Sequence, residues 1–485
     1  MTAHWYGQLH RDYLDKIEQA SRRWSGTGRP FFVSEFGDWG LPEMPLLEDP
    51  PFWDTRETYS VGLAGTMWPD TIGRFVRETQ RYQGLSDRLQ AEVWRRHDDI
   101  NGYCLTELTD VPHELNGLLD LHRRPKPLAV AEVRRANQTV LPMLEFDSLV
   151  AVAGSILRAR VHVSNDGPEL HDVVVEARFG DTATPMGLEE LLALDSSHLS
   201  TDDIVGRFSE SVAEARCDHL CGYAATAMAS ISVVVPDVPG SHDLVLRLRA
   251  ADGTEAENRY PIHVVRPRFA DVAVRVAGSP TTEESLRTVG ARIGDSGPLV
   301  VGENELDAAV GEQVRAALAD GSTVLVLAQP PEAAAHYPVP VTLDPIATAW
   351  GSTVFHFTTD HGAIASLPRR NVLVAEDSTI QATSVVGSIA GVAFPDTPVV
   401  LAYKPVPGAM TGTIVGSHAV GQGRLVLCQY RVRDRVIARD AAACALLADL
   451  VRWAAVGRPT LDVEPGTMAD GRQITSYTWR TEAGR

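Results

Sequence analysis

The chain has 485 residues, of which 44% are apolar and 22% are charged, values typical of a globular protein with two to four domains. Its formal net charge of −19 argues against nucleic acid and anionic membrane surfaces as partners, because both need a basic face. No run reaches the roughly 18 apolar residues of a membrane span. The first residues lack the basic and apolar regions of a signal peptide, which favours a cytoplasmic location.

The first segment, residues 1–142, alternates helical and strand patterns. Apolar residues recur every three or four positions from Leu9 to Trp24, which predicts a helix. "FFVSEF" at 31–36 predicts a short buried strand, and an amphipathic helix is expected over 72–93. "INGYCLTEL" at 100–108 predicts a second strand, and 127–140 a closing helix. This order predicts part of an α/β fold with a parallel sheet.

The pattern changes twice after this segment. Residues 143–266 alternate apolar and polar side chains between turn signals, which predicts an immunoglobulin-like β-sandwich, with 182–226 as an irregular excursion. Residues 267–457 return to an α/β pattern, with a strand–helix–strand unit between 297 and 331. Residues 458–485 begin a further β-like stretch that is too short to form a domain.

Two carboxylates end the predicted strands of the first segment. Glu35 lies at the end of one strand and Glu107 at the end of the next. In α/β barrels, active-site residues project from the carboxyl ends of the parallel strands. A carboxylate there can act as a nucleophile, a general base or a metal ligand. The alternative is that Glu35 only caps the turn "EFGDWG" by accepting backbone hydrogen bonds.

The stretch "RPFFVSEFGDWG" at 29–40 resembles the nucleophile segment of glycoside hydrolase family 2, which includes β-galactosidases, β-glucuronidases and β-mannosidases. The Ser-Glu-aromatic-Gly motif falls on Ser34–Gly37. Asn116–Pro127 resembles the loop after the family's eighth barrel strand, and "HWYG" at 4–7 resembles the end of the sixth. The resemblance implies the last two to three units of a (β/α)8 TIM barrel and a retaining hydrolase of β-linked glycosides. It assigns the nucleophile to Glu35 and implies no cofactor and no metal.

The same resemblance suggests which residues contact an oligosaccharide or glycoside substrate. A sugar ring stacks on apolar faces, and packing in the core is the alternative role for each aromatic residue. Thr106 stands where the family often has Trp. The expected substrate-binding residues are His4, Trp5, Tyr6, Trp39, Trp68, Glu107 and Asn116.

The general acid of this mechanism is expected before the nucleophile, as a Glu that follows an Asn. Only 34 residues precede Glu35, so the acid is expected upstream of Met1. The pair Asn304–Glu305 follows a different kind of strand, and neither Glu107 nor Asp110 stands at the family's position for the acid. The chain is therefore expected to be the C-terminal portion of a longer enzyme and poorly active by itself.

The cysteines give no clear metal or catalytic pattern. Cys217 and Cys221 flank His219, but a closed zinc site needs four ligands, so a plain loop or a disulfide is the alternative. Residues 267–457 resemble a flavodoxin-like glutamine-amidotransferase domain. Its nucleophile position holds Gln329 and Pro330 rather than Cys.

This α/β domain is expected to be non-catalytic, with a role in homo-oligomer contacts. Cys428 is expected in the core, and His356 and His361 have no nucleophile beside them in the sequence. The alternative function for the whole chain is a non-catalytic carbohydrate-binding or oligomerisation module.

Overall fold

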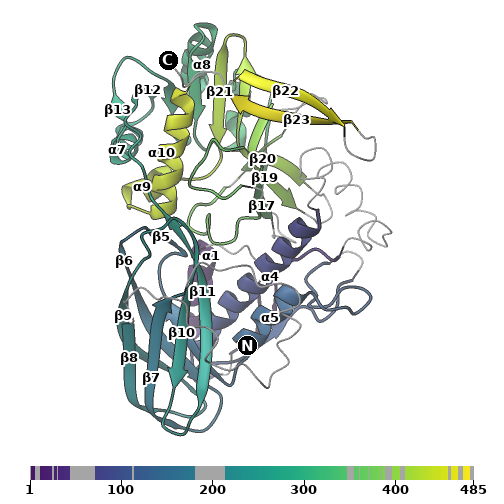
Figure 1. The fold of residues 1–485 in the computed structure, drawn as a ribbon, viewed down its shortest axis with the longest axis vertical. Coiled ribbons are helices and arrows are strands. Elements are labelled where there is room, and N and C mark those ends of the chain that lie inside the picture. Colours follow the sequence, from purple (N-terminus) through teal and green to yellow (C-terminus); the bar gives the residue numbers. More distant parts are fainter. Residues whose placement is uncertain are drawn as a thin grey trace.

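The chain adopts a mixed α/β structure with several β-sheets in the computed structural model (Figure 1). The described residues are 2–5, 11–24, 27–29, 31–43, 72–111, 114–180, 213–346, 354–359, 361–369, 371–382, 384–387, 396–404, 410–456, 460–467 and 473–480. None of the helices in these ranges is both long and apolar enough to cross a membrane.

The first part is a small parallel sheet covered by helices. Its strands β1 (Thr2–Trp5), β2 (Phe31–Phe36) and β3 (Ile100–Leu105) pair in that order. The helices are α1 (Arg11–Trp24), α4 (Ile72–Arg95) and α5 (Pro127–Ala136). Ile17, Val33 and Trp94 share a core between the helices and the sheet. The predicted helices and parallel strands are confirmed, although β3 ends at Leu105 rather than at residue 108.

Two mostly antiparallel sheets follow and share one core. One contains β4 (Val140–Glu145), β6 (Ile156–Asn165) and β9 (Ala224–Val234). The other contains β5 (Val150–Val152), β11 (Glu255–Val265), β10 (Gly240–Arg249), β7 (Leu170–Phe179) and β8 (Ala213–Leu220). β4 crosses the boundary that was expected at residue 142.

The expected irregular excursion at 182–226 is partly wrong. β8 and the start of β9 are regular strands within it, and residues 181–212 lie outside the described ranges. In β8 only Ala215 and Leu220 are buried, while the other side chains are half-buried or exposed. With so few large apolar residues, the alternation of this strand is hard to see in the sequence.

The third part is a ten-stranded mixed sheet with helices on its parallel half. β12 (Ala273–Ala277), β14 (Leu299–Val301), β15 (Thr323–Val326) and β21 (Gly423–Cys428) are mutually parallel, and β13 (Arg292–Ile293) extends them. The helices are α7 (Pro280–Thr288), α8 (Ala308–Ala319), α9 (Arg433–Ile437) and α10 (Ala441–Ala455), with the 3-10 helix η2 (Pro331–His336). The predicted strand–helix–strand unit is confirmed as β14–α8–β15.

The other half of this sheet is antiparallel. It contains β16 (Thr342–Pro345), β17 (Phe355–Thr358), β18 (Ser384–Gly387), β19 (Thr397–Lys404) and β20 (Met410–Val420). A separate pair, β22 (Thr460–Thr467) and β23 (Gln473–Arg480), ends the described chain.

Helix α4 lies between the antiparallel sheets and the ten-stranded sheet (Figure 1). At its start, Phe75 packs edge-on against Phe357, with 5.4 Å between ring centroids. Further along, Arg88 donates to Asn258 Oδ1 in β11 at 2.8 Å. As a result, one core cluster holds residues from all three parts of the chain.

Candidate active site

Glu35 and Glu107 lie at the carboxyl ends of neighbouring parallel strands. Glu35 is the second-last residue of β2, pairs with His4 of β1 in the strand register, and is half-buried. Phe36 pairs with Leu105, the last residue of β3, and Glu107 follows two residues later. The paired register therefore brings both carboxylates to the same edge of the sheet, where α/β barrels hold their active sites.

The two strand ends are in close backbone contact. The amide of Thr106 donates to the carbonyl oxygen of Phe36 at 2.8 Å. A Cβ atom on Gly37 would lie 2.3 Å from the carbonyl oxygen of Thr106, so only glycine fits there. The peptide bond that follows Thr106, between Thr106 and Glu107, is cis. The Gly of the Ser-Glu-aromatic-Gly motif is thus needed for this close approach.

The backbone of Glu107 is held from the following loop. Its amide donates to the carbonyl oxygen of Asn116 at 3.3 Å, and its carbonyl oxygen accepts from the amide of Leu118 at 3.1 Å. Gln83 of α4 donates to the same Asn116 carbonyl oxygen at 2.9 Å. The loop therefore folds back on the strand end and is braced by the helix behind it.

A pair of buried carboxyl groups lies directly behind the Glu35 segment. The amide of Asp38 donates to Asp87 Oδ1 at 2.8 Å, and Ser86 donates to Asp38 Oδ2. Burial, together with the charge of Asp38, raises the pKa of Asp87 well above its usual range. The Asp87 carboxyl group therefore holds its proton at pH values where an exposed aspartate has lost it.

Lys126 joins the loops that follow β2 and β3. Its buried ammonium donates to the carbonyl oxygen of Gly40 at 2.7 Å, to Asp110 Oδ1 at 2.7 Å and to the carbonyl oxygen of Leu115 at 2.9 Å. Burial lowers the pKa of Lys126. Burial also raises the pKa of Asp110 to about 6, although the neighbouring Lys126 opposes that shift. One side chain thus fixes both loops of the strand edge.

The residues expected to bind substrate are placed as follows. Trp39 is only 4% exposed and packs in the core, so its ring is not available to a sugar. Asn116 is 2% exposed, and its Oδ1 has no hydrogen-bond partner among the described residues. His4 and Trp5 belong to β1, where only their backbone is described. Tyr6 and Trp68 lie outside the described residues.

The carboxyl edge of the α/β part is filled by its own side chains. Glu305 accepts from the backbone amide of Ser279 at 3.1 Å and from Thr282 Oγ1 at 2.9 Å, at the start of α7. Gln329 is 1% exposed and donates to the carbonyl oxygen of Gly302 at 2.7 Å. Gln329 therefore serves as a structural residue, because it also accepts from the backbone amide of Leu306 at 3.0 Å.

The other candidate residues of the α/β part, Cys428, His356 and His361, are buried or half-buried. Cys428 is fully buried, and burial raises the pKa of its thiol to about 12. His356 Nδ1 lies 2.6 Å from Asp377 Oδ2, and Tyr430 donates to the same oxygen at 2.8 Å. Burial lowers the pKa of His361 to about 4. His356, Asp377 and Tyr430 therefore form a buried hydrogen-bonded cluster within the core of this part.

Cys217 and Cys221 form no disulfide with any described cysteine. Cys217 lies beside the carbonyl oxygen of His219, at 2.9 Å. In the ranges that the structure describes, no group of three or more His, Cys, Asp or Glu side chains is arranged to hold a metal ion.

Comparison with known proteins gives little similarity. No family model matches the sequence, and no curated protein matches it. The sporulation control protein Spo0M from Bacillus subtilis aligns over 31% of this chain and 55% of its own, at 11% identity and a TM-score of 0.17. A CARDB domain from Pyrococcus furiosus aligns over 26% and 86%, at 11% identity and a TM-score of 0.16. A superoxide reductase from Ignicoccus hospitalis aligns over 26% and 79%, at 14% identity and a TM-score of 0.15. Structural similarities with TM-scores this low do not support any conclusion about the fold or the function.

Proposed function

We propose that this chain carries the nucleophile-bearing part of a retaining glycoside hydrolase that acts on β-linked sugars, with Glu35 as the nucleophile. The observation that carries the proposal is the position of Glu35 on the last residues of a parallel strand whose end is fixed by its neighbour. The Ser34–Gly37 motif and its resemblance to glycoside hydrolase family 2 support the choice of reaction.

The proposal includes the finer fold assignments. The sheet β1–β2–β3 with its helices corresponds to the last units of a (β/α)8 barrel, and the antiparallel sheets to an immunoglobulin-like sandwich. The α/β part corresponds to a non-catalytic amidotransferase-like domain. The three-strand parallel order and the mainly antiparallel pairing of the second part agree with these assignments.

In the proposed reaction, a carboxylate oxygen of Glu35 attacks the anomeric carbon, the bond to the leaving oxygen breaks, and that oxygen takes up a proton from the general acid of the retaining mechanism. A glycosyl ester forms, and water then hydrolyses it with a second inversion, so that the configuration is retained. A nucleophile for this step must keep a fixed direction. The backbone contact of Gly37 with Thr106 and the buried groups Asp38 and Lys126 supply that rigidity.

The proposal is tested with 2-deoxy-2-fluoroglycosyl fluorides of the galacto, gluco and manno series. Fluoride leaves without a proton, so the label forms even where general acid catalysis is weak. The intact mass should show one added sugar, and peptide mapping should place it on Glu35. The variant Glu35→Gln should take no label, while Glu284→Gln, which changes an exposed carboxylate of α7, should label like the native protein.

A label on any other residue would overturn the assignment of Glu35. Binding of saccharides without turnover of any glycosyl fluoride would instead support the non-catalytic carbohydrate-binding module.

A further inference from the structure

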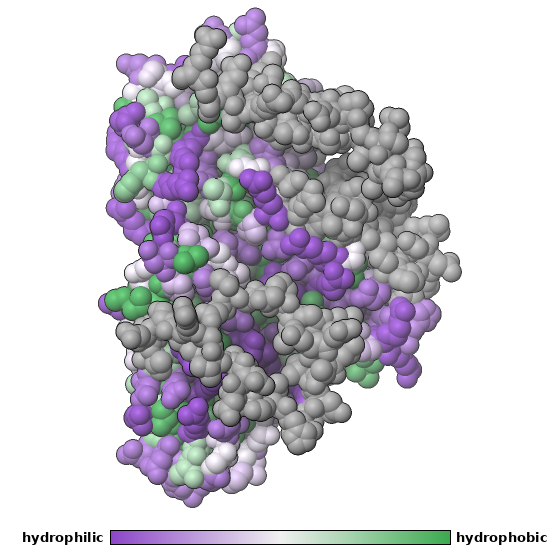
Figure 2. Space-filling model, in the orientation of Figure 1, coloured by the Kyte–Doolittle hydropathy of each residue, from purple (hydrophilic) through white to green (hydrophobic). Residues whose placement is uncertain are grey.

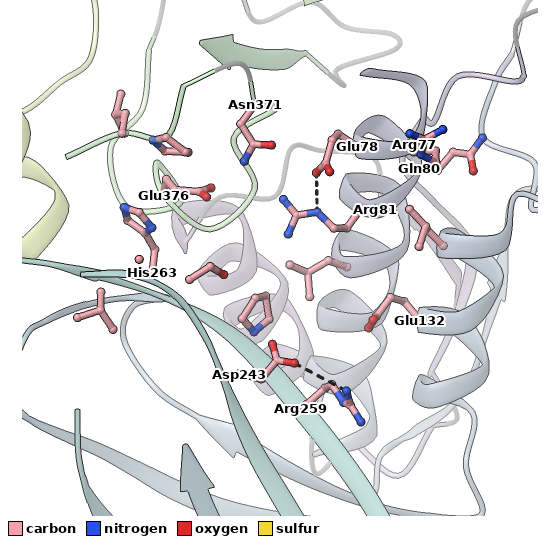
Figure 3. Close-up of a pocket in the computed structure, with 18 of the residues that line it drawn as sticks. Arg77, Glu78, Gln80, Arg81, Glu132, Asp243, Arg259, His263, Asn371 and Glu376 are labelled. Carbon is pink, nitrogen blue, oxygen red and sulfur yellow. Dashed lines mark hydrogen bonds and ion pairs between the residues drawn. The ribbon is translucent and has the colours of Figure 1, made fainter. Parts of the chain in front are cut away.

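A groove of about 1780 Å³ lies where the three parts of the chain meet, and Glu35 is not among the residues that line it (Figure 3). One wall is formed by α4 and α5, the second by β10 and β11, and the third by residues 365–376 and α10. Ligand sites occur preferentially at such junctions, and this groove is larger than the usual site for one small molecule. Its size suits an extended ligand.

Basic residues outnumber acidic ones in the groove, whereas acidic residues outnumber basic ones in the chain as a whole. The whole sequence has 44 basic Lys and Arg residues against 63 acidic ones, whereas nine arginines and seven acidic residues line the groove. Arg74, Arg77, Arg81 and Arg88 follow one another at helical spacing on one face of α4. Figure 2 shows hydrophilic side chains gathered over the middle of the molecule, where α4 lies. The lining therefore favours a negatively charged ligand.

Two of these guanidinium groups retain their donors for a ligand. Within the described ranges, Arg77 and Arg134 are exposed and have no ion pair or side-chain hydrogen bond. The Nε atoms of Arg135 and Arg259 are buried and have no hydrogen-bond partner there, but both guanidinium groups are ion-paired, Arg135 with Glu132 at 3.7 Å and Arg259 with Glu257 at 2.6 Å. Buried donors without an acceptor are uncommon in folded proteins. Arg88, by contrast, is fully engaged with Glu92, Glu132 and β11.

The lining also argues against ligands that bind mainly by stacking on aromatic side chains. None of the described residues that line the groove is Phe, Tyr or Trp, so nucleobases and neutral sugar rings find no aromatic ring on which to stack. Arginine forks bind carboxylate and sulfate groups through paired hydrogen bonds without stacking.

We propose that the groove binds an acidic oligosaccharide whose carboxylate or sulfate groups pair with Arg77 and Arg134. The choice of a saccharide rests on the function proposed above, whereas the choice of an anion rests on the groove alone.

The test is isothermal titration of the full chain with three probes: a sulfated heparin-derived hexasaccharide, a carboxylated oligogalacturonate hexamer, and neutral cellohexaose. At least one acidic probe should bind at low ionic strength, and raising the salt from roughly 0.05 to 0.3 M should weaken it. Cellohexaose should not bind. The stronger acidic probe shows whether sulfate or carboxylate is preferred.

The double variant Arg77→Ala/Arg134→Ala should weaken binding by about tenfold or more, since it removes two charge-assisted contacts. Both side chains are exposed, so the fold should be unaffected, and the thermal midpoint checks this. Arg158→Ala, which removes an exposed arginine of β6 outside the groove, is the matched control and should bind normally. Glu35→Gln should also bind normally, which separates this site from the proposed nucleophile.

The proposal is overturned if neither acidic probe binds at low salt, or if Arg158→Ala weakens binding as much as the double variant. Tighter binding of a poly-glutamate peptide than of either acidic saccharide would also overturn it, because the groove would then be a peptide site.

Discussion

The ammonium of Lys126 lies 2.7 Å from Oδ1 of Asp110, and both side chains are almost completely buried. Asp110 also accepts from the amide of Gly117 at 2.9 Å, while Lys126 reaches the carbonyl oxygen of Gly40. The pair therefore couples the loop after β3 to the loop after β2. This coupling leads to the first prediction.

Replacing Lys126 with Met should destabilise the protein by about 3–5 kcal/mol, because it leaves the Asp110 carboxylate buried without its counter-ion. The measurement is urea unfolding of the two single variants, Lys126→Met and Asp110→Asn, and of the double variant. The double variant should lower the free energy of unfolding by clearly less than the sum of the two single variants. Simple additivity would show that the ion pair does not couple the two loops.

Replacing Arg88 with Met should cost a similar amount, about 3–5 kcal/mol. Arg88 is fully buried and binds Glu92 Oε1 at 2.7 Å and Glu132 Oε2 at 2.5 Å, so its loss leaves the buried Glu92 without its ion-pair partner. The control is Arg287→Ala, which breaks an exposed pair with Glu283 and should cost less than about 1 kcal/mol. If Arg88→Met and Arg287→Ala lowered the free energy of unfolding equally, the buried ion pairs of Arg88 would not stabilise the fold more than an exposed pair does.

The contribution of Asp87 to the free energy of unfolding should fall as the pH rises above about 4. Its folded-state pKa lies above the unfolded value, so the folded state binds the proton more tightly, and this contribution is lost as the pH rises through the folded pKa. Asp110, with a pKa of about 6, acts in the same direction between about pH 4 and 6.

The variant Asp87→Asn keeps a neutral group and should be about 1–3 kcal/mol more stable than the native protein at pH 8, with a smaller difference at pH 4.5. Unfolding at both pH values measures this, with the exposed Asp295→Asn as the control. A pH-independent difference would speak against a protonated Asp87.

Replacing Gly37 with Ala should destabilise the strand edge by about 1–3 kcal/mol or more, because the new Cβ would meet the carbonyl oxygen of Thr106. Any glycosidase activity should fall with it, since Glu35 lies two residues away. Gly294→Ala adds its Cβ to open space and should be close to neutral. Thermal unfolding and hydrolysis of glycosyl fluorides provide the two readouts.

The five cysteines should differ in reactivity. Cys104 and Cys221 are exposed, so iodoacetamide at pH 8 should label them in the native protein. Cys428 is buried with a raised pKa, which leaves almost no thiolate, and it should react only after unfolding. Mass spectrometry of labelled peptides measures each site. Native labelling of Cys428 would contradict its place in the core.

The sequence was sufficient to predict the parallel strands and their helices, because these follow from apolar periodicity. It did not reveal the role of Asp87 or Arg88. Both stand among polar residues of α4, and a charged helix face normally indicates solvent. Here other parts of the chain cover that face, so most of its polar side chains from 82 to 95 are buried. Such burial depends on contacts across more than 150 residues, which a local pattern does not contain.

The position of Glu35 was predictable because a strand end is a local feature. The burial of Trp39, which removes its ring as a sugar-stacking surface, was not predictable from the local sequence. It depends on the residues of α4 and of the loop after β3 that belong to the same core cluster. The same limit applies to β8, where small and charged residues hide the alternation.

The position of α4 between the other two parts affects how the protein unfolds. Its first turns share aromatic contacts with β17, and its middle shares hydrogen bonds with β11 through the buried charges of Arg88 and Glu92. Neither neighbour can separate from the helix without exposing buried rings or an unpaired charge. Heating should therefore melt the three parts together, in one cooperative transition, rather than as independent units.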